Sequence, residues 1–149
     1  MSSAFTLRPY RNTDEDAVIE LWFRTWQQAY PSIDFSARLD TWRIRWRNEL
    51  APSARIIVAE KAASIVGFVT IDQTGYLDQL VVDPESWGSD LGNVLMTEAK
   101  LMSPEGITLL VNTDNARAIR FYTRNGFRHT HDDVNPVSGR LVYGMAWKP

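Results

Sequence analysis

Residues 115–127 read Asn-Ala-Arg-Ala-Ile-Arg-Phe-Tyr-Thr-Arg-Asn-Gly-Phe, and this stretch decides how the rest of the chain is interpreted. The residues from Asp114 to Asn125 are predicted to form a helix, and Gly126 suits the left-handed position just past a helix end. The preceding segment, 107–111, is rich in apolar and β-branched residues, which is typical of a buried strand. The stretch therefore predicts a strand, a helix and a glycine turn in succession.

A second strand, turn and helix precede this segment. The run Leu80-Val-Val-Asp-Pro84 ends an apolar strand, and Gly88 and Gly92 follow in the turn before a helix that is expected to reach about Met102. The first N–H groups of a helix lack intrahelical acceptors and the helix dipole is positive there, so such a turn can bind an anion. Taken alone, the two glycines are equally compatible with a simple tight turn.

The remaining elements follow from hydrophobic periodicity. The expected strands are 5–8, 55–60, 65–71, 75–83, 107–111, 127–130 and 140–147. The expected helices are one ending near Tyr30, one over 36–50, one ending near Met102 and one over 114–125. The segment 132–139 is the best candidate for a loop. Helices interleaved with strands predict an α/β or α+β fold with a mixed sheet.

Composition narrows the class of protein. The chain has 149 residues, 44% hydrophobic and 23% charged, which predicts one globular domain over 1–149. It has no cysteine and only two histidines, so we expect no disulfide, thiol nucleophile or metal site. A net charge of −2 argues against nucleic-acid binding. With no apolar run of membrane length and no signal-peptide pattern, we expect a cytoplasmic protein without a membrane partner.

Together the two motifs resemble those of the GCN5-related N-acetyltransferases, the GNAT family. The turn around Gly88 and Gly92 is similar to the coenzyme-A-binding motif, and Asn115–Tyr122 with Asn125-Gly-Phe127 is similar to the second family motif. The resemblance implies a single-domain GNAT-like fold, with a mixed central sheet splayed near its middle and about four flanking helices. It also implies an acyltransferase that moves an acetyl group directly from acetyl-coenzyme A (acetyl-CoA) to a primary amine of a small molecule, peptide or protein.

The resemblance implies which residues would bind acetyl-CoA, the acetyl donor. Backbone groups of Leu80 and Val82 would bond the pantetheine arm, as would Asn115. The amides that would hold the pyrophosphate are those of Gly88, Ser89, Asp90, Leu91, Gly92 and Asn93. Tyr122 would lie near the sulfur, where a hydroxyl can protonate the departing thiolate. Asn115 also suits a plain helix cap, and Tyr122 also suits a core position with its hydroxyl at the edge.

The first motif departs from the family at two positions. The family usually has Arg or Gln where this chain has Trp87, and Gly where it has Asp90. A carboxylate at Asp90 would repel pyrophosphate or cap the helix, unless it points outward. Arg117, Arg120 and Arg124 on the next helix are candidates to compensate the charge. The departures leave an alternative function open: a catalytically impaired GNAT-like domain that binds a ligand or partner.

The sequence says less about the catalytic base and about the site that would bind the amine acceptor. Asp78 is the candidate base, because acids in this region of the family are recurrent water-linked bases; it also suits an ordinary solvated position. Alternation along a strand would place Asp78, Leu80 and Val82 on one face.

The first two helices and the final hairpin shape the acceptor cleft in the family, which makes Trp26, Tyr30, Arg43 and Arg47 candidates there. Arg43 and Arg47, four residues apart, would share a helix face that either binds an acceptor anion or is simply solvated. The same Arg- and Trp-rich helix could alternatively bind nucleic acid, which the acidic chain disfavours. The family often dimerises, so a homodimer is possible.

Overall fold

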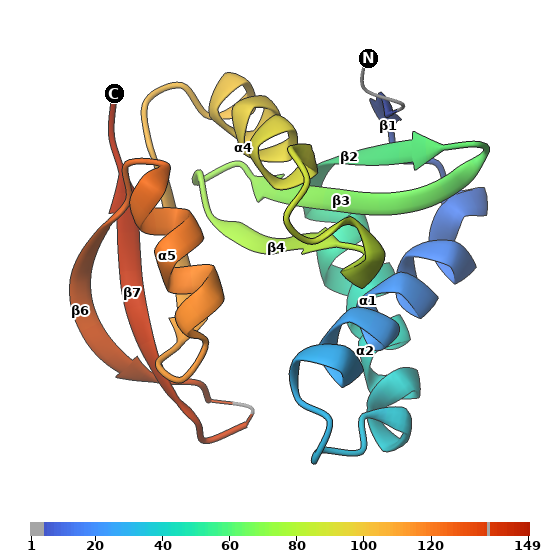
Figure 1. Cartoon of the computed structure of the whole chain (residues 1–149), viewed down its shortest axis with the longest axis horizontal. Helices are drawn as coiled ribbons and strands as arrows, with labels where there is room; N and C mark the ends of the chain where they lie inside the picture. Colours follow the sequence, from blue (N-terminus) through green and yellow to red (C-terminus); the bar gives the residue numbers. More distant parts are fainter. Residues whose placement is uncertain (1–4, 137) are drawn as a thin grey trace.

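The computed structural model describes residues 5–136 and 138–149, which form two sheets flanked by helices (Figure 1). The first sheet is antiparallel, with the order β1 (Thr6–Pro9), β2 (Ala54–Lys61), β3 (Ser64–Asp72) and β4 (Leu77–Val82). The second has the order β5 (Ile107–Asn112), β7 (Leu141–Trp147) and β6 (Arg128–Val134). The predicted mixed α/β class is confirmed.

The two sheets meet at one isolated parallel bridge within the described residues, between Tyr76 and Thr108. There the N–H of Thr108 donates to the carbonyl of Gly75 at 3.0 Å. Past this bridge β4 and β5 separate, and β4 is the edge of its sheet. Figure 1 shows β4 and the second sheet diverging from each other. The bridge is therefore the base of the expected splay.

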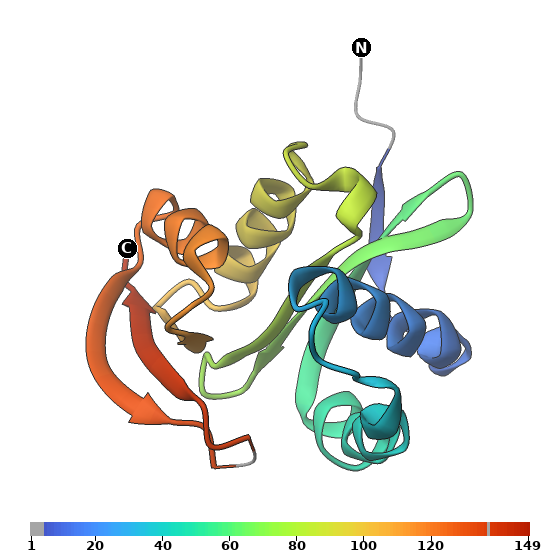
Figure 2. The same ribbon diagram turned by 60° about the horizontal axis from the view of Figure 1, so that its bottom comes forward.

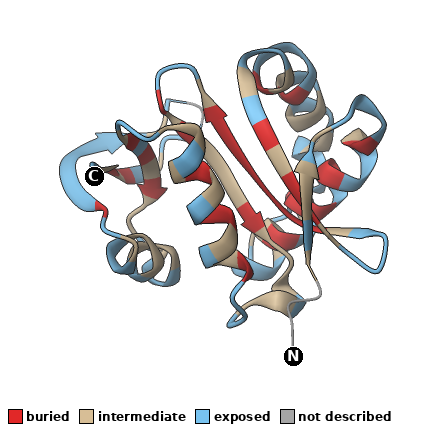
Figure 3. Cartoon of the chain, turned by 90° about the horizontal axis from the view of Figure 1, so that it is seen from above, coloured by how far each residue is buried: buried red, intermediate tan, exposed pale blue. Residues whose placement is uncertain are grey.

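Helices cover both faces of the first sheet (Figure 2). They are α1 (Glu15–Ala29), α2 (Leu39–Arg45) and its continuation α3 (Ala51–Ser53) on one face, and α4 (Leu91–Met102) on the other, with α5 (Ala116–Arg124) over the second sheet. Phe68 and Val81 pack toward the helices α1 and α2, while Val69 packs toward α4. Figure 3 shows buried residues along the strands and on the inward sides of the helices. None of the helices in the described ranges is long and apolar enough to cross a membrane.

Two predicted elements differ from the structure. The helix expected over 36–50 is broken into a 3₁₀ turn, α2, a π turn over 46–50 and α3, which continues to Ser53. Pro52 does not stop it, because the proline falls in the first turn of α3, where its missing N–H costs nothing. The loop expected over 132–139 is also wrong in part, since β6 pairs with β7 as far as Val134. Every side chain of β6 is exposed, so its sequence carries no apolar alternation.

Trp46 is the largest fully buried side chain and joins α1 and α2 to the first sheet. Its indole Nε1–H donates to the hydroxyl of Tyr10 at 2.9 Å, and its ring contacts Phe68 edge-on. The π turn that follows α2 begins at Trp46. Packing around this residue therefore holds the irregular second helix against β3.

We expect Trp46→Ala to lower the free energy of unfolding by about 3–5 kcal/mol, because it leaves a cavity and an unpaired Tyr10 hydroxyl. The matched control is Ile44→Ala in the same helix, where the side chain is 60% exposed and the change should stay within about 0.5 kcal/mol. Urea denaturation followed by circular dichroism measures both. Equal losses in the two variants would contradict this account of the core.

Candidate functional site

The loop between β4 and α4 turns the backbone sharply at the edge of the splay. The carboxylate of Asp83 caps the first turn by accepting the N–H of Glu85 at 3.1 Å. Gly88 then has φ +84°, a left-handed conformation that favours glycine, and no atom lies within 4 Å of where its Cβ would be. Open space therefore lies over the backbone just before α4.

Several N–H groups of this loop and of the first turn of α4 lack a partner in the described residues. They are the N–H groups of Gly88, Asp90, Gly92 and Asn93. The other two predicted amides are used inside the loop, since Leu91 donates to the Oγ of Ser89 and Ser89 donates to the carbonyl of Ser86. Free N–H groups at the positive end of a helix fit a pyrophosphate.

Asp90 does not block these amides. Its carboxylate makes no cap bond to α4 and instead accepts the side-chain amide of Asn93 at 3.3 Å on the exposed surface. Of the two arrangements that the sequence left open, helix capping is therefore not the one observed. The donors that an anion needs remain free beside an exposed carboxylate.

The open edge of β4 presents backbone groups to the splay. Hydrogen bonding alternates along antiparallel strands, and Asp83 bonds to β3 at 2.8 Å, so Val81 bonds inward as well. The backbone groups of Leu80 and Val82 consequently point away from β3. One of these groups, the carbonyl of Val82, already accepts a hydrogen bond from the indole Nε1–H of Trp87 at 2.8 Å.

Tyr122 lies on α5, and Asn115 is the residue that caps the start of this helix. The Oδ1 of Asn115 caps the helix by accepting the N–H of Ala118 at 3.2 Å, which leaves its Nδ2 without a partner in the described residues. Burial raises the pKa of Tyr122 to about 12, and the nearby Tyr76 adds to the shift. The Tyr122 phenol is therefore protonated at neutral pH and can donate a hydrogen bond.

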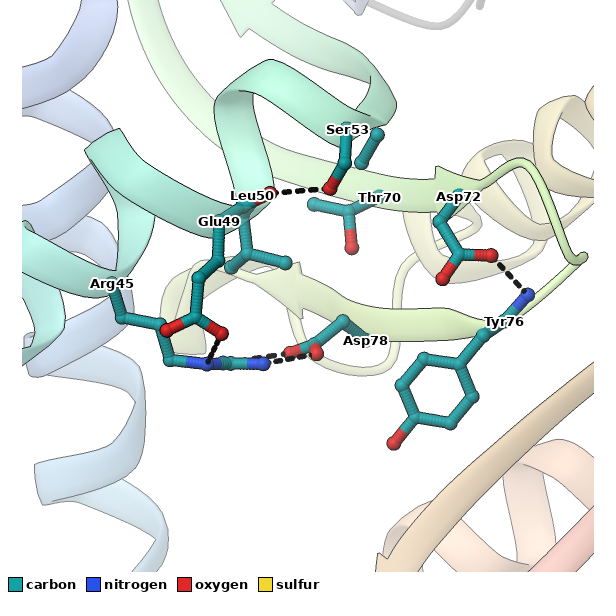
Figure 4. A pocket seen from close by; sticks show the side chains of 9 residues that line it. Arg45, Glu49, Leu50, Ser53, Thr70, Asp72, Tyr76 and Asp78 are labelled. Carbon is teal, nitrogen blue, oxygen red and sulfur yellow. Dashed lines mark hydrogen bonds and ion pairs between the residues drawn. The ribbon is translucent and has the colours of Figure 1, made fainter.

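Tyr76 is a site residue that the sequence did not single out. It forms the bridge at the base of the splay, and burial together with the Asp78 carboxylate raises its pKa to about 12. It also lines a cavity of about 150 Å³ on the α2 side of β4 (Figure 4). The only sequence signal was an aromatic residue directly after Gly75 at a strand start, which resembles ordinary core packing.

Asp78 does not share a face with Leu80 and Val82, so that expectation is wrong. The pairing of β3 with β4 shifts register opposite Val69–Ile71, and such a bulge reverses the alternation of side chains. Leu80 and Val82 pack on the α4 side, whereas both carboxylate oxygens of Asp78 accept from Arg45 of α2, one of them at 3.0 Å. Figure 4 shows this pair in the cavity beside Tyr76.

The four acceptor candidates separate into two places. Trp26 and Tyr30 stack at the end of α1, with ring centroids 5.7 Å apart. Arg43 and Arg47 instead bond to Glu15 at the start of α1. Glu15 and Tyr30 lie at opposite ends of α1, about 20 Å apart at about 1.5 Å per helical residue. Arg43 and Arg47 are therefore far from Tyr30, and their guanidinium groups are already paired. Of the four, Tyr30 contacts β5, and Trp26 is linked to it by stacking on Tyr30.

Tyr30 ties α1 to the far end of β5. Its hydroxyl donates to the carboxylate of Asp114 at 3.1 Å and accepts from the amide of Asn112 at 3.2 Å. Arg140 at the start of β7 also bonds Asp114, at 2.5 Å, and its guanidinium lies 4.6 Å from the centre of the Tyr30 ring. Helix α1, strand β5 and the final hairpin thus meet through one polar cluster.

Comparisons with known proteins agree with this geometry. The family model of the Acetyltransferase (GNAT) domain matches residues 28–148. The peptidyl-lysine N-acetyltransferase YjaB of Escherichia coli is 29% identical over 133 residues, covering 84% of this chain and 83% of that protein. The apo solution structure of YjaB has a TM-score of 0.79 at 24% identity, covering 97% and 98% of the chains. The PaiA N-acetyltransferase of Thermoplasma acidophilum, solved with coenzyme A, has a TM-score of 0.76 at 20% identity over the whole of both chains.

The tyrosines of the site predict how stability depends on alkaline pH. Because the pKa values of Tyr76 and Tyr122 are raised from 10 to about 12, the folded state holds these protons more tightly than the unfolded state. Their contribution to stability is complete below pH 10 and is lost as the pH rises toward 12. We expect urea denaturation to show Tyr122→Phe losing less stability than the wild type between about pH 9 and 11. Parallel curves would contradict the buried environment of Tyr122.

Proposed function

Because the chain belongs to the GNAT acetyltransferase family, we propose that it acetylates the side-chain amine of lysine residues in a peptide or protein. The chain is an acyltransferase, and acetyl-CoA is its co-substrate. The observation that carries the proposal is the row of free N–H groups beside the open edge of β4, facing Tyr122. The lysine acceptor is supported by the name of YjaB, a peptidyl-lysine N-acetyltransferase.

The chain offers complementary groups to each part of the donor. The free amides at the start of α4 bind the pyrophosphate, and the Nδ2 of Asn115 bonds the pantetheine region. The edge of β4 forms hydrogen bonds with the pantetheine arm in the way it would with a neighbouring strand. The groups used are the N–H and carbonyl of Leu80 and the N–H of Val82. The Val82 carbonyl is already used by Trp87.

The chemistry needs one proton acceptor for the amine and two hydrogen-bond donors, one for the oxyanion and one for the departing thiolate. The amine attacks the thioester carbonyl, a C–N bond forms, the C–S bond breaks, and the amine proton leaves. An N–H on the edge of β4 stabilises the oxyanion, and the hydroxyl of Tyr122 bonds the departing thiolate. A phenol with a pKa of about 12 is a weak acid, so its hydrogen bond to the developing charge is its main contribution.

The cavity beside Tyr76 suits a cationic acceptor. Three carboxylates line it, from Glu49, Asp72 and Asp78, against one guanidinium, from Arg45. The local charge of −2 attracts a lysine ammonium group and repels an anionic acceptor. We assign Asp78, whose carboxylate is paired with Arg45, as the group that receives the amine proton.

The first test is acetylation of a lysine-containing peptide by the purified protein with acetyl-CoA, followed by mass spectrometry. We expect the label on the lysine side chain and none on the matched peptide in which lysine is replaced by arginine. Tyr122→Phe should lower kcat by about a hundredfold, because it removes the bond to the thiolate, while KM for acetyl-CoA should change by less than about twofold. A label only on the N-terminal amine would refute the lysine acceptor.

Asp78→Asn should lower kcat most at low pH, where nearly all lysine amine is protonated and a base is needed. The difference from wild type should shrink as the pH approaches the lysine pKa, about 10.4. The matched control is Glu49→Gln from the same cavity, which should raise KM for the peptide without changing the pH profile. A rate loss in Asp78→Asn that is constant with pH would mean that the carboxylate acts structurally.

Other expectations from the sequence stay predictions. They are the single domain over 1–149, the homodimer, the cytoplasmic location and the absence of a nucleic-acid or membrane partner. The impaired alternative rested on the departures from the family motif at Trp87 and Asp90. The carboxylate of Asp90 bonds Asn93 and makes no cap bond to α4. We therefore favour the active enzyme.

A further inference from the structure

Two residues from the loop after β4 and from α5 meet at the candidate donor site. The guanidinium carbon of Arg117 lies 3.7 Å from the centroid of the Trp87 indole. Trp87 belongs to the loop that follows β4, whereas Arg117 lies in the first turn of α5. The contact therefore joins the two sides of the candidate donor site.

Trp87 is held in place next to the free amides. Its Nε1–H donates to the Val82 carbonyl at 2.8 Å, and its backbone N–H donates to the carbonyl of Pro84 at 3.2 Å. Gly88, whose own N–H has no acceptor in the described chain, follows it directly. The indole thus presents a fixed flat surface at the rim of the amide cradle.

Arg117 has no negatively charged partner in the described ranges. Arg45 and Arg140 bond to aspartates, but no hydrogen bond or ion pair is made by the guanidinium of Arg117. Its packing against the loop and the nearby Arg120 lower the pKa of Arg117. Stacking on an aromatic face leaves the N–H groups at the rim of a guanidinium free, so they can bond a phosphate in two places.

We propose that Arg117, held on the face of Trp87, binds the pyrophosphate of coenzyme A together with the free amides and offsets the charge of Asp90. The proposal rests on the proposed function, because it concerns the same donor site. It also selects one of the three arginines of α5. Arg124 lies about 10 Å further along the helix, at about 1.5 Å per residue, and so cannot share this place.

The experiment is calorimetric titration of the full chain with coenzyme A at low and moderate salt. We expect Arg117→Gln to weaken binding about tenfold or more, because a bond to a charged group is lost. It should also flatten the salt dependence. Arg124→Gln removes the same charge from the same helix and should stay within about twofold of wild type. Arg117→Lys keeps the charge without the flat group, and should retain the salt dependence with intermediate affinity.

Dephospho-coenzyme A identifies the phosphate involved, since it has the pyrophosphate but lacks the 3′-phosphate. The loss in Arg117→Gln should persist with this ligand; its disappearance would overturn the pyrophosphate assignment. Equal losses in Arg117→Gln and Arg124→Gln, or none in Arg117→Gln, would overturn the inference while wild-type binding supports the proposed function. A folded wild-type chain that does not bind coenzyme A would instead refute the proposed function.

Discussion

The bridge between Tyr76 and Thr108 is the constraint on which the rest of the structure depends. It is where the two sheets join in the described chain, and β4 and β5 part beyond it. Had the two strands paired along their length, the backbone groups of Leu80 and Val82 would be consumed inside one continuous sheet. The divergence leaves the groups of Leu80 and the N–H of Val82 free to bond another extended molecule, while Trp87 occupies the Val82 carbonyl.

The candidate site is a group of hydrogen-bond donors that have no acceptor in the described residues. The first N–H groups of a helix have no intrahelical acceptors, and such donors together with a cation fit an anionic ligand. Here backbone N–H groups, the Nδ2 of Asn115 and the guanidinium of Arg117 converge from β4, α4 and α5. All are donors or cations, and the partner they fit is an extended molecule with anionic phosphates at one end.

Short sequence patterns predicted the features that depend only on residues close together in the chain. The glycine turn before α4 and the Asn115 cap are set by backbone conformation, so both could be read from the sequence. The face on which Asp78 lies could not, because a bulge depends on how β3 and β4 pair. The ion pair of Arg43 could not be predicted for a related reason: its partner, Glu15, lies 28 residues away, and no spacing rule reports such a contact. Tyr76 was missed because its importance comes from its position between two sheets.

The cluster of Tyr30, Asp114 and Arg140 gives the splay a second attachment, four residues along β5 from Thr108 at Asn112. One end is thus a backbone bridge and the other a set of side-chain bonds exposed to water, which yield more readily. The buried core cluster also spans both sheets, so apolar packing holds the two halves together beside these polar contacts. Because Asp114 is the shared acceptor of this cluster, one substitution there would release Tyr30 and Arg140 together, and α1 would lose its polar link to the final hairpin.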